Sequence, residues 1–235
     1  MIIQDTYTKA IPFLRIDEYP QIKIQDKESF LFHYTFDKQF GNDLWHHYLN
    51  FLPYNFQNEV LRFRRWQDRY NCLLGKLMVY VGFKIFYNSE LSFENFLKDS
   101  YGKPYIKDCK MNFNISHSGN TVVCIFSKEP IGIDVEEAKD IEYTLFENVF
   151  TDQEMKEISS VGLSKFYEYW TKKEAIIKAI GKGMSIPLLD IEVKGDHSIY
   201  DGIKWNIKSL KLNNMNCAIA SKYNTNNVNL FEVVF

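Results

Sequence analysis

The stretch MNFNISHSGNTVVCIFSKEPIGIDVE, residues Met111–Glu136, decides the fold class predicted for this chain. It contains three short runs rich in apolar and β-branched residues, which are typical of strands: Met111–Ser116, Thr121–Phe126 and Ile131–Glu136. Only a few residues, among them glycine, asparagine and proline, separate one run from the next. Because such short connections join antiparallel neighbours, we expect an antiparallel meander here.

Helical patterns flank this stretch on both sides. Apolar residues recur at three- and four-residue steps from Phe56 to about Phe83, and a second long helix is predicted from about Ser164 to Ile180. A shorter helix is expected over Leu44–Leu52, and Thr151 and Glu154 have the spacing of a capping box at the start of another. Helices mixed with antiparallel strands place the chain in the α+β class.

Additional strands are expected towards both ends of the chain, over Ile11–Ile16, Phe30–Phe36 and Val228–Val234. No low-complexity or Gly/Ser-rich linker divides the 235 residues. This length and continuity suit a single domain or two closely packed halves.

Composition excludes several classes of protein. The chain has 28 Lys and Arg against 30 Asp and Glu, a net charge of −2, which argues against nucleic-acid binding as its main role. Its 4 cysteines stand far apart without a C-x-x-C pair, as in a reduced interior rather than a disulfide or zinc framework. No secretory signal and no apolar run of roughly 20 residues is visible. We therefore expect a cytoplasmic protein without a membrane partner.

Two acidic residues alternate on the third predicted strand. Asp134 and Glu136 share a face with Gly132, while Ile131, Ile133 and Val135 occupy the other face. Their Cα atoms would lie roughly 6–7 Å apart, so both carboxylates can reach one small cation such as Mg²⁺, which prefers oxygen ligands. On spacing alone, a polar sheet face wetted by solvent is the more common explanation.

A second acidic residue pattern lies on the helix predicted to end at Ile180. Trp170, Glu174 and Lys178 follow one another at four-residue steps and share one stripe. Glu174 can serve as a further oxygen ligand or a general base, and Lys178 as a phosphate or proton partner. The alternative is an ordinary i,i+4 ion pair that stabilises the helix by about 0.2–0.5 kcal/mol.

Polar residues at a strand end and a basic helix segment are two further candidates. Ser116 and His117, with nearby backbone amides, can receive phosphate oxygens. A Ser–His nucleophile pair is hindered because adjacent residues of a strand point to opposite faces, and an ordinary polar turn is the plain alternative. The arginines of Arg62–Arg69 best fit the solvent-exposed face of an amphipathic helix, from which one or two of them can bind a ligand phosphate.

In their order and identity, these segments resemble the motifs of the 4′-phosphopantetheinyl transferases of the long, surfactin-synthetase-activating (Sfp) type. The motif-bearing segments are Tyr101–Pro104, Phe113–Gly119, Ile131–Glu136, Trp170–Ala175 with Lys178, and Gly181–Gly183. The resemblance spans about residues 73–188. It implies an enzyme that moves the phosphopantetheine arm of coenzyme A to a serine of an apo acyl or peptidyl carrier protein, with Mg²⁺, releasing 3′,5′-ADP.

The resemblance also implies a fold and residue roles. The expected fold has two similar α+β halves, related by a pseudo-twofold axis, with the active site in the cleft between them, and the expected state is a monomer. We place the halves at residues 1–108 and 109–235. The implied roles are Mg²⁺ ligation by Asp134, Glu136 and Glu174; catalysis by Glu174, directly or through a water, and by Lys178; and coenzyme A binding by Gly102, Lys103, Pro104, Ser116, His117 and Lys178.

One departure from the family pattern concerns the nucleotide 3′-phosphate. Asn71 and Glu59 stand where basic residues are expected, and Arg62, Arg65 or Arg69 are possible substitutes. Two other functions remain compatible with the residues: a non-catalytic module that binds coenzyme A or a carrier protein, and a Mg²⁺-dependent phosphohydrolase.

Overall fold

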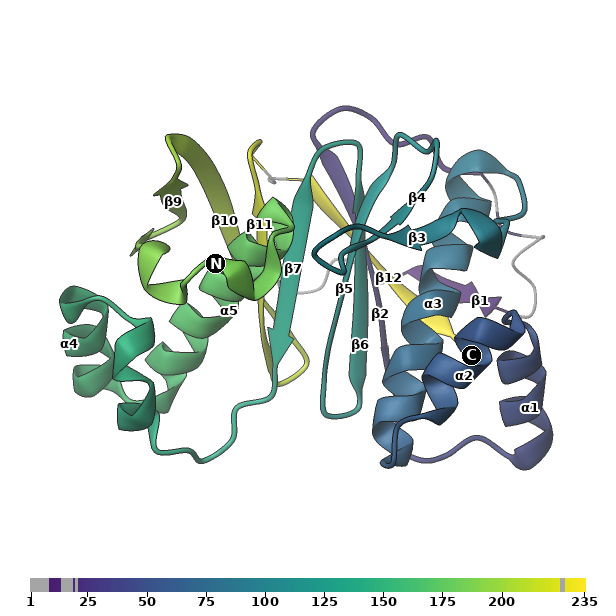
Figure 1. Ribbon diagram of the computed structural model, residues 1–235, viewed down its shortest axis with the longest axis horizontal. Helices are drawn as coiled ribbons and strands as arrows, with labels where there is room; N and C mark the ends of the chain where they lie inside the picture. Colours follow the sequence, from purple (N-terminus) through teal and green to yellow (C-terminus); the bar gives the residue numbers. More distant parts are fainter. Residues whose placement is uncertain (1–8, 14–18, 20, 225–226) are drawn as a thin grey trace.

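The computed structural model describes residues 9–13, 19, 21–224 and 227–235, and it contains two five-stranded sheets that lie side by side (Figure 1). The first sheet has the strand order β1 (Lys9–Pro12), β12 (Asn227–Val234), β2 (Glu28–Thr35), β6 (Thr121–Ser127) and β5 (Asn112–Ser118). The second has the order β7 (Ile131–Glu136), β11 (Met215–Ser221), β10 (Ile203–Leu212), β9 (His197–Tyr200) and β8 (Val193–Lys194). A small hairpin consists of β3 (Phe96–Lys98) and β4 (Pro104–Ile106).

Helices cover one face of each sheet (Figure 1). Those of the first half are α1 (Asn42–Asn50), α2 (Tyr54–Leu61) and α3 (Trp66–Tyr87). Those of the second half are α4 (Asp152–Val161) and α5 (Leu163–Ile180). None of the helices in the described part of the chain is long and apolar enough to cross a membrane.

The two halves repeat one topological unit, which is a strand, a long helix and an antiparallel hairpin. In the first half β2 precedes α3 and the hairpin β5–β6, and β6 pairs with both β2 and β5. In the second half β7 precedes α5 and the hairpin β10–β11, and β11 pairs with both β7 and β10. This confirms the predicted α+β fold with two similar halves.

The prediction of a three-stranded meander is wrong for its third strand. β5 and β6 form the expected antiparallel hairpin, but β6 takes β2 as its second neighbour and β7 pairs with β11 instead. Both hairpin strands therefore belong to the first sheet, and the sheets divide the chain between Ser127 and Ile131, later than the boundary expected at residues 108 and 109. β12 then returns to the first sheet, in parallel with β2.

The helix predicted from Phe56 to Phe83 is two helices. The chain leaves the helical path between Leu61 and Trp66, and the carbonyl of Phe63 accepts a hydrogen bond of 2.8 Å from Nε of Arg69. The break allows α2 to pack beside α3, so that both contribute to one core. Of the predicted strand Ile11–Ile16, only residues up to 13 lie among the described residues, and β1 ends at Pro12.

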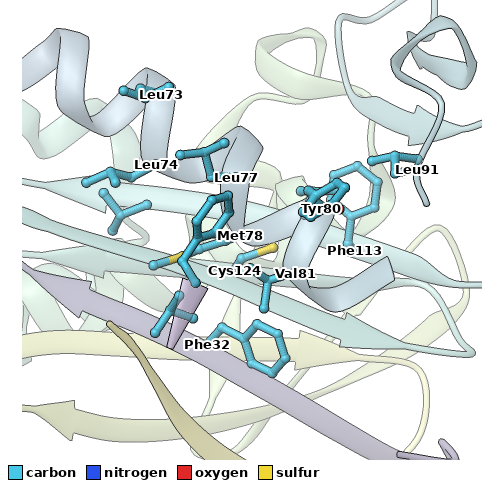
Figure 2. Close-up of a cluster of buried hydrophobic side chains, with 14 of the residues drawn as sticks. Phe32, Leu73, Leu74, Leu77, Met78, Tyr80, Val81, Leu91, Phe113 and Cys124 are labelled. Atoms are coloured by element: carbon cyan, nitrogen blue, oxygen red, sulfur yellow. The ribbon is translucent and has the colours of Figure 1, made fainter. Parts of the chain in front are cut away.

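The largest core fills the space between α3 and the first sheet, as Figure 2 shows for part of it. Leu74, Met78 and Val81 of α3 point towards the sheet, and these three side chains are fully buried, as are those of Leu73 and Leu77. A second core lies between α5 and the second sheet, and a third includes apolar side chains from both sheets. The third core therefore fixes the two halves to each other.

Candidate functional site

The site begins with the close approach of α5 to β7. A Cβ atom at Gly132 would overlap the main-chain carbonyl of Ala175 and the amide nitrogen of Ala179, so only glycine allows this packing. The contact brings the end of α5 over the acidic face of β7. Lys178 places its Nζ 2.6 Å from Oδ1 of Asp134, whose side chain is only 4% exposed. The solvent-wetted face considered from spacing is therefore wrong for Asp134.

The two halves meet where β5 lies beside β7 (Figure 1). These edge strands are joined by side chains of β5 that accept hydrogen bonds from main-chain N–H groups of the β7 segment. Asn114 accepts from Ile133 at 2.8 Å and Ser116 accepts from Val135 at 3.3 Å. Ser118 accepts from Glu137 at 3.1 Å. Three polar residues at every second position thus replace the backbone ladder that would otherwise join two neighbouring strands.

Ser116 is at the centre of the site. Besides Val135, its Oγ accepts a hydrogen bond of 2.9 Å from Nζ of Lys178 and donates one of 3.0 Å to Oδ1 of Asp134. A hydroxyl has one donor and two acceptor positions, so its hydrogen-bonding capacity is fully used. The structural role of Asn114, Ser116 and Ser118 was not predicted, although their strict alternation along one strand was a readable signal.

The acidic residues influence one another electrostatically. Burial, followed by the charge of Asp134, raises the pKa of Glu136 even though Ser118 donates a hydrogen bond of 2.8 Å to it. Burial and the charge of Asp134 also raise the pKa of Glu174, which the nearby ammonium of Lys178 partly offsets. The structure therefore brings all three predicted acids and Lys178 within electrostatic reach, with negative charge in excess.

The described residues contain no group of three or more His, Cys, Asp and Glu side chains arranged to hold a metal ion. Lys178 supplies the positive charge next to Asp134 instead. The chemistry of the donors nevertheless fits a hard cation. Oδ2 of Asp134 is buried, and no hydrogen-bond partner for it lies among the described residues. An unpartnered buried carboxylate oxygen is costly, and coordination by a divalent cation would satisfy it.

His117 lies next to this network on an exposed stretch of β5. The protein around the imidazole lowers its pKa, and the positive charge of Lys178 acts in the same direction, whereas Asp68 and Asp134 oppose it. The ring is therefore mainly neutral at pH 7. His117 is therefore influenced by charges both from α3, which carries Asp68, and from the site formed by Asp134 and Lys178.

The turn that contains Gly102, Lys103 and Pro104 reaches the C-terminal end of α5, the end that carries Lys178. Nζ of Lys103 donates hydrogen bonds to the main-chain carbonyls of Lys178, at 2.6 Å, and Ala179, at 3.2 Å. Burial lowers the pKa of Lys103 to about 8. Of these three predicted residues, Lys103 is thus the one that contacts an element of the site.

The positions that depart from the family pattern have structural partners. Asn71 is buried and donates a hydrogen bond of 3.1 Å to the carbonyl of Gly119, at the tip of the β5–β6 hairpin. Glu59 forms ion pairs with Lys76 at 3.1 Å and Lys98 at 3.0 Å. Lysines therefore provide positive charge around Glu59, on α3 and β3.

A buried ion pair within the second half was missed from the sequence. Nζ of Lys173 lies 2.8 Å from Oε2 of Glu154, with side chains 0% and 2% exposed. Glu154 also completes the predicted capping box with Thr151 and accepts a hydrogen bond of 3.0 Å from the N–H of Val193. The readable signal was that Lys173 stands four residues after the buried Tyr169, on the apolar stripe of α5.

Comparison with known proteins agrees with this architecture. Residues 130–220 match the 4′-phosphopantetheinyl transferase superfamily, and residues 41–129 match the family described as 4′-phosphopantetheinyl transferase, N-terminal. The chain is 38% identical over 159 residues to 4′-phosphopantetheinyl transferase gsp of Aneurinibacillus migulanus, covering 63% of this chain and 65% of that protein. It is 34% identical over 152 residues to 4′-phosphopantetheinyl transferase Sfp of Bacillus subtilis, covering 63% and 68%.

The matched stretch thus spans about two thirds of the length of each of these curated relatives. The family matches meet between residues 129 and 130, in the connection from β6 to β7 that separates the two sheets. Fold, motif order and similarity over this length agree, and the chain belongs to the 4′-phosphopantetheinyl transferase superfamily.

Proposed function

We propose that this protein transfers the 4′-phosphopantetheine arm of coenzyme A to a serine hydroxyl of an apo carrier protein and releases 3′,5′-ADP. The observation that carries the proposal is the network of Asp134, Lys178 and Ser116 at the junction of the two halves. The network contains a buried carboxylate and a cation, and two further acids of raised pKa, Glu136 and Glu174, lie near it. The family to which the protein belongs performs this reaction. The acceptor serine belongs to the carrier, so the chain needs no nucleophile of its own.

The reaction is a displacement at phosphorus. The serine oxygen forms a bond to the phosphorus that carries pantetheine, and the bond from this phosphorus to the bridging oxygen of the pyrophosphate breaks. The nucleotide leaves with the bridging oxygen, and the serine proton passes to a base. Such transfer depends mainly on positioning and on neutralising phosphate charge, which are the properties that a preorganised charged site supplies.

We assign proton acceptance to Glu174 and charge neutralisation to Lys178. Glu174 lies on α5 one turn before Lys178, and its raised pKa makes it a better base than an exposed carboxylate. Lys178 lies at the end of α5, where its ammonium already faces a carboxylate oxygen of Asp134 at 2.6 Å. The ammonium has three N–H donors; two contact Ser116 and Asp134, and the third can donate to a phosphate oxygen of the substrate.

Asp134, Glu136 and Glu174 are the residues that would hold Mg²⁺. The unpartnered buried oxygen of Asp134 and the mutual repulsion of the three acids support this assignment. The ion when bound supplies Lewis-acid neutralisation of the pyrophosphate charge. We further assign a phosphate contact to His117 and the nucleotide pocket to the turn with Gly102 and Pro104, whereas the Ser116 hydroxyl is already occupied by Asp134, Val135 and Lys178.

The test is an assay with several apo carrier proteins. The protein is incubated with coenzyme A, Mg²⁺ and each carrier, and the carriers are weighed by mass spectrometry. We expect at least one carrier to gain the mass of one phosphopantetheine, with equimolar release of 3′,5′-ADP. Folded protein that binds coenzyme A without modifying any carrier would instead be a binding module, and phosphate release from nucleotides without an acceptor would indicate a phosphohydrolase.

A further inference from the structure

The loop between β3 and β4 carries a lysine from the first half of the molecule into the second half. Nζ of Lys103 donates hydrogen bonds to the main-chain carbonyls of Lys178 and Ala179, at 2.6 and 3.2 Å. These carbonyls belong to the last turn of α5, where no further turn follows to satisfy them. The ammonium also meets the negative end of the helix dipole. Lys103 thus caps α5 from outside its own half.

The loop is held in the conformation that this contact requires. Oδ1 of Asp99 accepts hydrogen bonds of 2.9 Å from the N–H groups of both Tyr101 and Lys103. The N–H of Gly102 donates to the carbonyl of Asp99 at 3.0 Å, and Gly102 has a φ of +84°, which favours glycine. Lys103 therefore projects from a tight, internally bonded turn rather than from a loose loop.

The receiving end of α5 is shaped for the lysine stem. A Cβ atom at Gly181 would lie 3.0 Å from Cδ of Lys103, closer than side chains normally approach. Gly181 also has a φ of +85°, the left-handed conformation that ends a helix. The glycine after α5 therefore both terminates the helix and leaves room for the aliphatic part of Lys103.

The residue that Lys103 holds is a functional one. Lys178 has its main-chain carbonyl bound by Lys103, while its side chain contacts Asp134 at 2.6 Å and Ser116 at 2.9 Å. The main chain of Lys178 is thus held by Lys103, and the ammonium of Lys178 is held by Asp134 and Ser116. We infer that Lys103 is a positioning residue, which fixes the last turn of α5 and so holds the Lys178 ammonium in place for transfer. This inference rests on the proposed function.

The role differs from that of a nucleotide contact in what it predicts for kinetics. A residue that only binds coenzyme A changes KM, whereas a residue that orients a transition-state group changes kcat. Misplacement of a reacting group by about 1 Å can cost on the order of 10²-fold in rate. Loss of the Lys103 amine should therefore lower kcat more than it raises KM for coenzyme A.

The experiment uses Lys103→Met, which keeps the stem and removes the amine, on the full chain with a carrier that the wild type modifies. We expect kcat to fall by about 10- to 100-fold with KM for coenzyme A within about threefold. Hydrogen exchange should become faster in the last turn of α5 and remain unchanged in α3. Lys103→Arg, which restores a cation, should recover part of kcat, and Lys107→Met, at an exposed lysine after β4, should match the wild type.

A second variant keeps the inference testable if Lys103→Met does not fold. Asp99→Ala loosens the turn but leaves the amine, so it should lower kcat by a smaller factor in the same direction. A rise in KM for coenzyme A with unchanged kcat, or unchanged exchange at the end of α5, would overturn the positioning role. If the wild type modifies no carrier, the proposed function itself is wrong. If the wild type modifies a carrier and Lys103→Met has the same kcat and KM, only the positioning role of Lys103 is wrong.

Discussion

β2 and β7 are the first strands of the two repeated units, and the residues between each strand and its helix are opposite in character. In β2 the side chains facing α3 include Phe30 and Phe32, which contact the ring of Phe86 on that helix. In β7 the corresponding face carries Gly132, Asp134 and Glu136 beneath α5. In the first half, aromatic rings fill the space between strand and helix. In the second half, glycine allows the helix to lie directly against the strand, and the other positions on that face are charged.

The difference shows how a repeated fold divides its tasks. The first half holds the largest core and supplies the edge strand β5, whose polar side chains fix β7 in place. The second half uses that support to keep charged groups in a partly dry environment, where electrostatic interactions are stronger. The charged strand–helix contact is thus supported, through β5, by the half that holds the largest apolar core.

The most severe way to break the charged contact is Asp134→Asn. The substitution keeps the shape of the side chain but removes its negative charge. In the wild type this charge faces Lys178 and contributes to the raised pKa of Glu174. We expect carrier modification to fall by about 10³-fold or more, in line with loss of a central electrostatic group. The thermal midpoint should shift by only a few degrees, because Lys178 is 28% exposed and can turn to solvent.

The measurement is kcat/KM for an accepted carrier, with Asp196→Asn, at an exposed residue, as the matched control. Activity within tenfold of the wild type would remove Asp134 from the site and leave the proposed ligand set without its centre.

Charges in the second half also stabilise the fold, and Glu154→Gln tests this separately. The variant leaves the ammonium of Lys173 buried without its counter-ion, 2.8 Å away in the wild type. Breaking a buried pair in this way costs about 3–5 kcal/mol in the free energy of unfolding. Urea denaturation measures the loss. The exposed pair of Glu192 and Lys194 provides the control, since Glu192→Gln should cost less than about 1 kcal/mol.

Equal losses in the two variants would show that the buried pair is no more important than a surface one. The second half would then owe its stability chiefly to its apolar cores.

The same small substitution in both halves sharpens the comparison further. Gly82→Ala on α3 forces a methyl group against the ring of Phe126, and Gly132→Ala on β7 forces one against the backbone of α5. Overpacking of this kind costs about 1–3 kcal/mol in either half. Only Gly132→Ala should also lower kcat, because it displaces the helix that carries Glu174 and Lys178.

Both variants are compared by thermal unfolding and by the carrier assay at a temperature where each is folded. A loss of kcat in Gly82→Ala equal to that in Gly132→Ala would mean that the two strand–helix contacts do not differ in function.

Much of this arrangement could be predicted from the sequence because it depends on local patterns. Alternation identified the strands of residues 111–136 and placed Asp134 and Glu136 on one face, and four-residue steps placed Glu174 and Lys178 on one side of α5. The capping box of Thr151 and Glu154 is formed as predicted. These features require only the geometry of a single element.

The remaining features depend on which elements become neighbours. Alternation gives the face of a strand but not its partner, so the pairing of β7 with β11 could not be predicted from residues 131–136. For the same reason Ser116 resembled a ligand contact, although its first partners are Val135, Asp134 and Lys178. A polar residue is most easily misassigned where two halves of a molecule meet.

The last prediction concerns the pH dependence of stability at Lys103, which joins the two halves. Burial lowers its pKa to about 8 in the folded protein, whereas the unfolded chain retains the ordinary value near 10.5. Between these values the unfolded chain binds more protons, so the free energy of unfolding rises with pH. Relative to Lys103→Met, the wild type should gain up to about 1.4 kcal/mol per pH unit. Urea denaturation of both proteins from about pH 7 to pH 10 measures the difference. Parallel curves would mean that the ammonium is solvated and that the halves are joined without it.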